Sequence, residues 1–144
     1  DPDVQAVLIL IYTGLRVGEF LALRPASIKI RERYLDIKHS KTVAGVRKVP
    51  VARKVLPFVE SLKARGGIGM DYEQFHRRFD KVMKTLKMHH TPHECRHTCA
   101  SMLDSTGASD TACRMILGHA RPGITKGVYT HKALADLRKA IDRV

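Results

Sequence analysis

Apolar residues recur with helical spacing at the start of the chain. The members of this stripe are Val4, Val7, Leu8 and Ile11. Positions i, i+3, i+4 and i+7 share one helix face, so the spacing predicts a helix with one buried side. Asp1 and Pro2 suit its first turn, and Gly14 suits its C-terminal cap. A second, short helix is predicted from about Arg16 and should be closed by Pro25.

The pattern changes to a weak alternation of apolar and polar residues over 33–38 and 46–51. This period of two is typical of strands, and the polar segment 40–45 between them suits a turn. We therefore predict a β-hairpin, with residues 28–30 as a third strand.

Helical spacing returns in the rest of the sequence. The predicted helices cover residues 52–64, 72–87, 92–105, 109–117 and 132–142. Glycines at 66, 67 and 118 interrupt this part of the chain. The expected fold is mainly α with a small antiparallel β-sheet, an α+β domain.

The composition indicates a single folded domain and the kind of partner that it binds. The 144 residues suffice for one domain with a hydrophobic core, and 44% apolar residues is ordinary for a globular protein. Lysine and arginine total 26 against 14 acidic residues, which gives a net charge of +12. A folded domain this basic usually meets a polyanion, and a nucleic acid is the first candidate.

Cysteine spacing and hydropathy bear on the compartment. Cys95, Cys99 and Cys113 are odd in number and lack C-x-x-C spacing, so we expect reduced, mostly core thiols. The most apolar run, 4–12, is too short to span a bilayer. We expect a cytoplasmic protein without a membrane partner.

Residues suited to chemistry gather in short strings. They are TGLRVGE at 13–19, SKT at 40–42, HECRHT at 93–98, LGH at 117–119 and YTH at 129–131. Their order and residue types resemble the catalytic domain of the tyrosine recombinases, the phage integrase family. The resemblance covers essentially the whole chain. One string alone would be weak, but the strings in this order are specific.

The resemblance implies the tyrosine recombinase catalytic-domain fold and a set of site residues. Two arginines would grip phosphate, a lysine would lie on the hairpin turn, two histidines would line the site, and a tyrosine would be the nucleophile. In that order, these residues are Arg16 and Arg96, Lys41, His93 and His119, and Tyr129.

The resemblance also implies an activity and its partners. The expected reaction is site-specific recombination or integration of double-stranded DNA through a 3′-phosphotyrosyl intermediate, with no metal, ATP or other cofactor. Residues 1–144 would be the catalytic domain of a longer protein, whose N-terminal DNA-binding part is absent from this chain. The domain would be a monomer by itself and would join a synaptic complex of several protomers, a tetramer, on DNA.

Physical chemistry supports these roles. Cutting a phosphodiester without metal requires neutralising charge on its non-bridging oxygens, and paired guanidinium groups offer rigid forks of donors with a permanent charge. A tyrosine hydroxyl with a pKa near 10 is a weak nucleophile at neutral pH and needs assistance. The leaving 5′-oxygen needs a proton, which an ammonium group can supply.

Spacing around the strings assigns further roles. His93 and Arg96 lie three residues apart and should share one helix face, opposite an apolar face. That apolar face consists of Cys95, Cys99, Met102 and Leu103. Glu19, three residues after Arg16, is most simply a partner that holds the arginine side chain. His97 is expected to be a core or capping histidine.

Two other classes of function remain open at this point. A non-enzymatic DNA-binding module would account for the charge but would leave Tyr129 unused. The segment 93–97 also matches H-E-x-x-H, the zinc-protease helix motif. That reading lacks a third ligand and would put Arg96 beside the cation, so it is the weaker one. Type IB topoisomerases share the recombinase chemistry, but the LGH and YTH strings look like a recombinase.

Overall fold

The structure is a computed structural model that describes residues 1–40, 42–119 and 131–144. Its helices are α1 (Pro2–Thr13), α2 (Val17–Leu21), α3 (Leu56–Ala64), α4 (Tyr72–Thr85), α5 (Pro92–Ser105), α6 (Asp110–Leu117) and α7 (His131–Asp142). Its strands are β1 (Ile28–Lys29), β2 (Tyr34–Ile37) and β3 (Arg47–Pro50). The predicted fold class, mainly helical with a small sheet, is confirmed.

The strands form one antiparallel sheet in the order β1-β2-β3. Leu35 of β2 pairs with Val49 of β3 and with Ile28 of β1. All three side chains are buried, because they point to the same face of the sheet. The predicted hairpin and its third strand are therefore confirmed.

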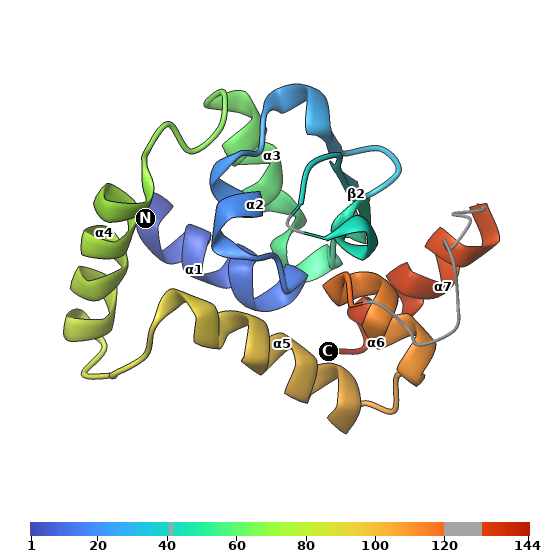
Figure 1. Ribbon diagram of the computed structural model, residues 1–144. Coiled ribbons are helices and arrows are strands. Elements are labelled where there is room, and N and C mark those ends of the chain that lie inside the picture. The colour runs from blue at the N-terminus through green and yellow to red at the C-terminus, as the bar shows by residue number, and fades with distance from the viewer. Residues whose placement is uncertain (41, 120–130) are drawn as a thin grey trace.

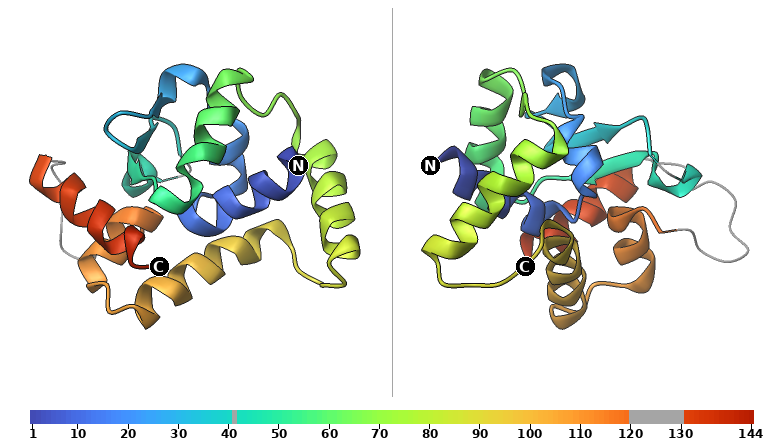
Figure 2. Two further views of the ribbon diagram at one scale, coloured as in Figure 1. Left: turned by 180° about the vertical axis from the view of Figure 1, so that it is seen from behind. Right: turned by 60° about the vertical axis from the view of Figure 1, so that its left-hand side comes forward.

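Helices pack around the central helix α1, and the sheet lies to one side of it (Figures 1 and 2). Helix α5 packs along α1, and α4 contacts α1 near its N-terminal end, where Arg78 pairs with Asp3. Helices α6 and α7 both pack on β3. This arrangement brings the C-terminal ends of α1 and α6 close to the hairpin. None of the helices in the described ranges is both long and apolar enough to cross a membrane.

Local chemistry explains the helix boundaries. The Asp1 carboxylate accepts a hydrogen bond from the Asp3 N–H and caps α1, and Gly14 ends α1 at φ 69°. The predicted helix 52–64 starts late: residues 53–55 form a 3₁₀ turn, and Pro57 lies in the first turn of α3. Helix α2 ends at Leu21, so Pro25 does not close it but opens another 3₁₀ turn.

The cysteines behave largely as predicted. Cys95 and Cys99 are buried on the side of α5 that faces the core, and Cys113 is half-buried; all three are free thiols. Burial raises the pKa of Cys95 to about 11 and that of Cys99 to about 12. At neutral pH these thiols are protonated and unreactive, as expected of core residues.

The last helix uses its apolar stripe within its own chain. The buried members of the stripe are Leu134, Leu137, Ala140 and Ile141. They cover β3 and α6. This stripe is therefore part of the hydrophobic core of its own chain.

An ion pair fixes the end of α7 to the sheet. The Arg33 guanidinium donates from Nη1 and Nη2 to the two Asp142 oxygens, each at 2.9 Å. Asp142 also accepts the Arg53 backbone N–H at 3.0 Å. Burial by itself raises the pKa of Asp142, but the hydrogen bonds and charges of Arg33 and Arg53 outweigh it and hold this pKa below its usual value.

We predict that Asp142→Asn destabilises the domain by about 1 kcal/mol at pH 7, because a partly exposed, charge-assisted pair is lost. A carboxyl group with a lowered folded-state pKa stabilises the fold above its unfolded pKa, and this stabilisation is lost as the pH falls through the folded pKa. Urea unfolding of both proteins between pH 7 and pH 3 should therefore show the two stabilities converging in acid. A constant gap would contradict the assignment.

Candidate active site

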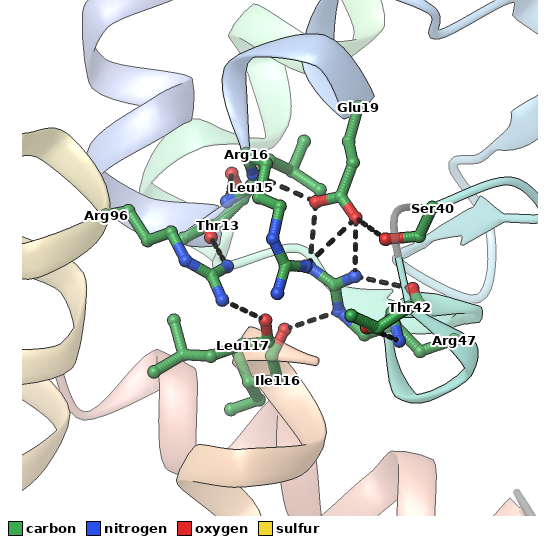
Figure 3. A network of polar contacts seen from close by, with 12 residues as sticks. Thr13, Leu15, Arg16, Glu19, Ser40, Thr42, Arg47, Arg96, Ile116 and Leu117 are labelled. Carbon is green, nitrogen blue, oxygen red and sulfur yellow. Dashed lines mark hydrogen bonds and ion pairs between the residues drawn. The ribbon is translucent and has the colours of Figure 1, made fainter. Parts of the chain in front are cut away.

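Three arginine side chains from three elements converge on one point (Figure 3). Arg16 precedes α2, Arg47 lies on β3, and Arg96 lies on α5. The Glu19 carboxylate lies beside Arg16 and Arg47, and the last carbonyl groups of α6 lie beside Arg47 and Arg96. We refer to Arg16, Glu19, Arg47 and Arg96 as the arginine cluster.

Arg96 is held between the C-terminal ends of two helices. Its Nη1 donates to the carbonyl of Gly14, the cap of α1, at 2.6 Å, and its Nη2 donates to the carbonyl of Leu117 in α6 at 2.5 Å. Carbonyl groups at helix C-termini lack partners within the helix and carry partial negative charge, so a guanidinium satisfies both needs. The orientation of Arg96 is thereby fixed although only 6% of the residue is exposed.

Arg47 is the most deeply buried charge of the cluster, with 0% of its side chain exposed. It donates from Nη1 to Glu19 Oε2 at 2.8 Å and from Nη2 to Glu19 Oε1 at 3.1 Å. Nη1 also donates to the Gly45 carbonyl at 2.5 Å, and Nε donates to the Ile116 carbonyl at 2.9 Å. Arg47 thus links α2, the hairpin turn and α6.

Glu19 accepts hydrogen bonds from three segments. Besides Arg47, its oxygens accept the Arg16 backbone N–H at 2.9 Å and the Ser40 hydroxyl at 2.9 Å. Burial by itself raises the pKa of this carboxyl group. The hydrogen bonds and charge of Arg47, followed by those from Arg16 and Ser40, outweigh burial and lower the pKa below its ordinary value. Glu19 is therefore ionised at neutral pH.

Arg16 differs from the other two arginines in its exposure. Its Nη1 lies 3.4 Å from Glu19 Oε2, and 22% of its side chain remains exposed. Its backbone N–H caps the start of α2 through Glu19. The predicted link between Arg16 and Glu19 is confirmed, but the closer partner of Glu19 is Arg47.

Glycines permit the close approach of these segments. Gly118 ends α6 at φ 73°, and a Cβ atom there would lie 2.7 Å from Arg47 Nη1 and 2.8 Å from its Cζ. A Cβ atom at Gly14 would lie 2.6 Å from the Leu117 side chain. The glycine of the LGH string is needed both for its backbone conformation and for space above the Arg47 guanidinium.

The described part of the cluster is electropositive, since three guanidinium groups face one carboxylate. Burial, followed by the charges of Arg16 and Arg47, lowers the pKa of Arg96 to about 10, so it remains charged at neutral pH. His119 is exposed, and its backbone N–H donates to the Arg114 carbonyl at 3.0 Å. Partial desolvation and the charges of Arg96 and Arg16 lower the pKa of His119, which favours a neutral imidazole.

His93 lies in the first turn of α5, where it is exposed. Its ring packs edge-on against that of His97, with centroids 4.9 Å apart. The prediction for His97 is wrong: it is exposed in the middle of α5, because the core face of this helix is taken by Cys95, Cys99 and Leu103.

Within the described ranges, no group of three or more His, Cys, Asp or Glu side chains could hold a metal ion.

Two of the predicted site residues, Lys41 and Tyr129, lie outside the described residues. The neighbours of Lys41 have defined contacts. The Ser40 hydroxyl donates to Glu19, and the Thr42 hydroxyl accepts the Gly45 N–H at 3.2 Å. Through Glu19 the structure connects Arg16 to the hairpin turn, whereas Arg96 is held by the carbonyl groups of Gly14 and Leu117. His119 lies at the edge of the same cluster.

Arg47 is the residue that sequence reasoning missed. Arg47 stands beside Lys48 in a basic hairpin, where a cation is usually solvated. A usable signal existed, because Arg47 and Val49 are two residues apart on one strand and must share a face. A charge beside a buried valine needs a buried partner. Only the folded chain shows that this partner is Glu19.

The Phage integrase family model matches residues 2–135 of this chain. The tyrosine recombinase XerA of Saccharolobus solfataricus is 25% identical over 142 residues, which cover 94% of this chain and 48% of XerA. The integrase from mycobacterium phage Brujita superposes with a TM-score of 0.76 at 16% identity, over 99% of this chain and 51% of that one.

The Tn1549 transposon integrase, solved in complex with transposon right end DNA, superposes with a TM-score of 0.65 at 21% identity. That match covers 81% of this chain and 50% of the integrase. The fold is that of the catalytic domains of tyrosine recombinases and integrases. The chain belongs to the Phage integrase family, and it spans about half the length of the relatives that it matches.

We predict that Gly118→Ala destabilises the domain more than Gly107→Ala does. Both glycines have positive φ, 73° and 81°, so both alanines carry left-handed strain of about 1–2 kcal/mol. A Cβ atom at Gly107 would meet nothing within 4 Å, whereas one at Gly118 would overlap the Arg47 guanidinium. We expect an additional loss of about 1–3 kcal/mol for Gly118→Ala. Equal losses in urea unfolding would disprove the close contact.

Proposed function

We propose that this chain is the catalytic domain of a site-specific DNA recombinase or integrase, which cuts and rejoins DNA through a 3′-phosphotyrosyl intermediate on Tyr129. The observation that carries the proposal is the arginine cluster: a positively charged site, held rigidly by helix ends, in a chain of the Phage integrase family. Such a site suits a phosphodiester whose non-bridging oxygens gain charge as the bond breaks.

The two arginines of the predicted set have the chemistry for this task. Arg96 uses one N–H of Nη1 and one of Nη2 on backbone carbonyls, and a guanidinium has five N–H groups. Arg16 has an exposed portion and stands at the same cluster. In our proposal each arginine donates to a non-bridging oxygen, and neither one moves during the reaction because its supporting contacts are already formed.

Proton transfers complete the proposed mechanism. His119, whose pKa is lowered, is neutral near pH 7 and can accept the Tyr129 proton or donate a hydrogen bond to the phosphate. His93 would be a second donor to the phosphate from the start of α5. Lys41, which follows Ser40 on the hairpin turn, would protonate the leaving 5′-oxygen. The ester formed on tyrosine keeps the bond energy, so resealing needs neither ATP nor a metal ion.

The proposed partner is double-stranded DNA. The net charge of +12 supplies sequence-independent attraction to phosphates, and the related Tn1549 integrase was solved on transposon end DNA. We propose that the domain is a monomer without DNA and works in a tetrameric synaptic complex, and that N-terminal DNA-binding regions accompany it in the whole protein. The proposed location is the cytoplasm.

A covalent trap tests the reaction directly. The chain is incubated in EDTA with a pool of nicked duplexes of randomised sequence, which lose a short 5′-terminal fragment after cleavage and so cannot be resealed. We expect a slow-migrating protein–DNA adduct on a denaturing gel, and we expect Tyr129→Phe to abolish it because only the phenolic oxygen forms the ester.

The other tyrosines supply the control for this experiment. Tyr72→Phe changes an exposed tyrosine at the start of α4, on the opposite side of the molecule from α6, and should leave the adduct intact. An adduct that survives Tyr129→Phe, or one that EDTA prevents, would refute the proposal. DNA binding without any adduct would favour the non-enzymatic binding module.

The role of Lys41 as general acid is tested by changing the leaving group. Proton donation to an alkoxide is worth about 10²–10⁴ in rate. A thiolate leaving group needs no such help, since the pKa of a thiol is roughly 8.5. Lys41→Ala should therefore cleave an ordinary phosphodiester slowly, yet cleave a 5′-bridging phosphorothiolate at nearly the wild-type rate.

Neighbouring residues make this test specific. Arg96→Ala should be slow on both substrates, because its proposed role is to stabilise charge on the non-bridging oxygens. Lys38→Ala and Lys48→Ala should keep near-normal rates on the ordinary substrate. If Lys41→Ala is equally slow on the sulfur substrate, or if Lys38→Ala shows the rescue instead, Lys41 is not the acid.

A further inference from the structure

We infer that Arg47 is a positioning residue of the reaction: by occupying both oxygens of Glu19, it keeps the Arg16 guanidinium available for the DNA phosphate. The inference rests on the proposed function, since it assigns Arg47 a part in the same site. It concerns a residue that does not touch the substrate, because 0% of the Arg47 side chain is exposed.

Glu19 has two guanidinium groups within reach but only one charge to share. Arg47 approaches the carboxylate in bidentate fashion at 2.8 and 3.1 Å, whereas the shortest Arg16 side-chain contact is 3.4 Å. A bidentate pair in a buried setting is strong, because two parallel N–H···O bonds and a low dielectric act together. Arg47 therefore neutralises most of the Glu19 charge, and the positive charge of Arg16 remains largely uncompensated.

The two arginines differ in exposure, and therefore in what each can bind. The side chain of Arg47 is inaccessible, so it cannot bind a phosphate from solvent, while 22% of the Arg16 side chain is exposed. Without Arg47, Glu19 would be a buried carboxylate whose remaining hydrogen-bond partners among the described residues are the Ser40 hydroxyl and one cation, Arg16. An ionised Glu19 would then pair closely with Arg16 and neutralise the arginine that the phosphate requires.

Arg47 also fixes the spacing of two catalytic segments. Through the Gly45 carbonyl it holds the end of the segment that leads into β3, and through the Ile116 carbonyl it holds the end of α6, next to Gly118 and His119. The two roles of Arg47, charge and tether, can be separated. A lysine at this position keeps the charge but cannot match the fork of contacts, and a methionine keeps neither.

The test compares Arg47→Met, Arg47→Lys and the double variant Glu19→Gln/Arg47→Met with the wild-type chain. Adduct formation with the randomised nicked duplexes is measured as a single-turnover rate at pH 8, where an unpartnered carboxyl group beside Arg16 is ionised. We expect Arg47→Met to lose about 10²-fold, comparable to the loss of one oxyanion donor. Its affinity for an intact duplex should change less than about threefold, because Arg47 makes no contact with solvent.

The double variant distinguishes charge from scaffolding. It removes the carboxylate that would capture Arg16, so it should recover at least about tenfold of the lost rate, a coupling of the size that contacting charges show. An Arg47 that acts only as a tether predicts no recovery, since the double variant restores neither the hydrogen bond to Gly45 nor the one to Ile116. Arg47→Lys should stay within about tenfold of the wild-type rate, because the lysine ammonium group still pairs with Glu19 and leaves Arg16 available.

Arg33→Met is the matched control. Arg33 also makes a bidentate pair with a carboxylate, Asp142, and also donates to a backbone carbonyl, that of Val51 at 2.9 Å. Its loss should lower thermal stability, although by less than Arg47→Met because the Arg33–Asp142 pair is partly exposed. It should change the adduct rate less than about threefold, because Arg33 lies outside the arginine cluster.

Each result decides the matter. The inference is wrong if Arg47→Met reacts as fast as Arg33→Met, or if the double variant is no faster than Arg47→Met. If Arg47→Met does not fold, by circular dichroism, then Arg47→Lys decides: a loss beyond tenfold overturns the inference, and a smaller one supports it. A wild-type chain that gives no adduct refutes the proposed function and the inference with it. A wild-type adduct that is insensitive to Arg47 refutes the inference alone.

Discussion

A single buried carboxylate, that of Glu19, joins segments that are far apart in the sequence. It caps α2 through the Arg16 N–H, holds the hairpin turn through Ser40, and binds β3 through Arg47, which in turn reaches α6. Isolated buried charges are very unfavourable, so Glu19 and Arg47 each require the other. The folds of α2, the hairpin and the end of α6 therefore depend on one another at the proposed phosphate site.

Carbonyl groups at the ends of helices stabilise the neighbouring guanidinium groups of the cluster. Arg47 and Arg96 repel each other and Arg16, yet both donate to carbonyl groups at the C-terminal end of α6, and Arg96 also donates to the end of α1. These carbonyl groups would otherwise lack partners, and their dipoles favour positive charge. The charge that makes the site attractive to an anion is thus supported by the backbone before any anion arrives.

The sequence predicts the parts of this arrangement that are local. Helix starts and ends, the hairpin and the apolar faces follow from spacing and from caps such as Asp1 and Gly14, because these depend on neighbours along the chain. The pairing of Arg47 with Glu19 spans 28 positions and depends on tertiary structure, so spacing could not reveal it. The same holds for the stripe of α7, whose partner surface on β3 and α6 is defined only by the folded chain.

The electrostatics of the cluster also constrain how the reaction can depend on pH. Even with its pKa lowered to about 10, Arg96 stays charged across the neutral range, and Glu19, whose pKa is lowered, stays ionised there. The lowered pKa of His119 favours its neutral form, so this residue adds little positive charge at neutral pH. The attraction for phosphate is therefore constant over the range in which proton transfers change. In the proposed mechanism, any pH dependence of cleavage near neutrality must come from the groups that move protons, and the phosphate-binding arginines contribute none of it.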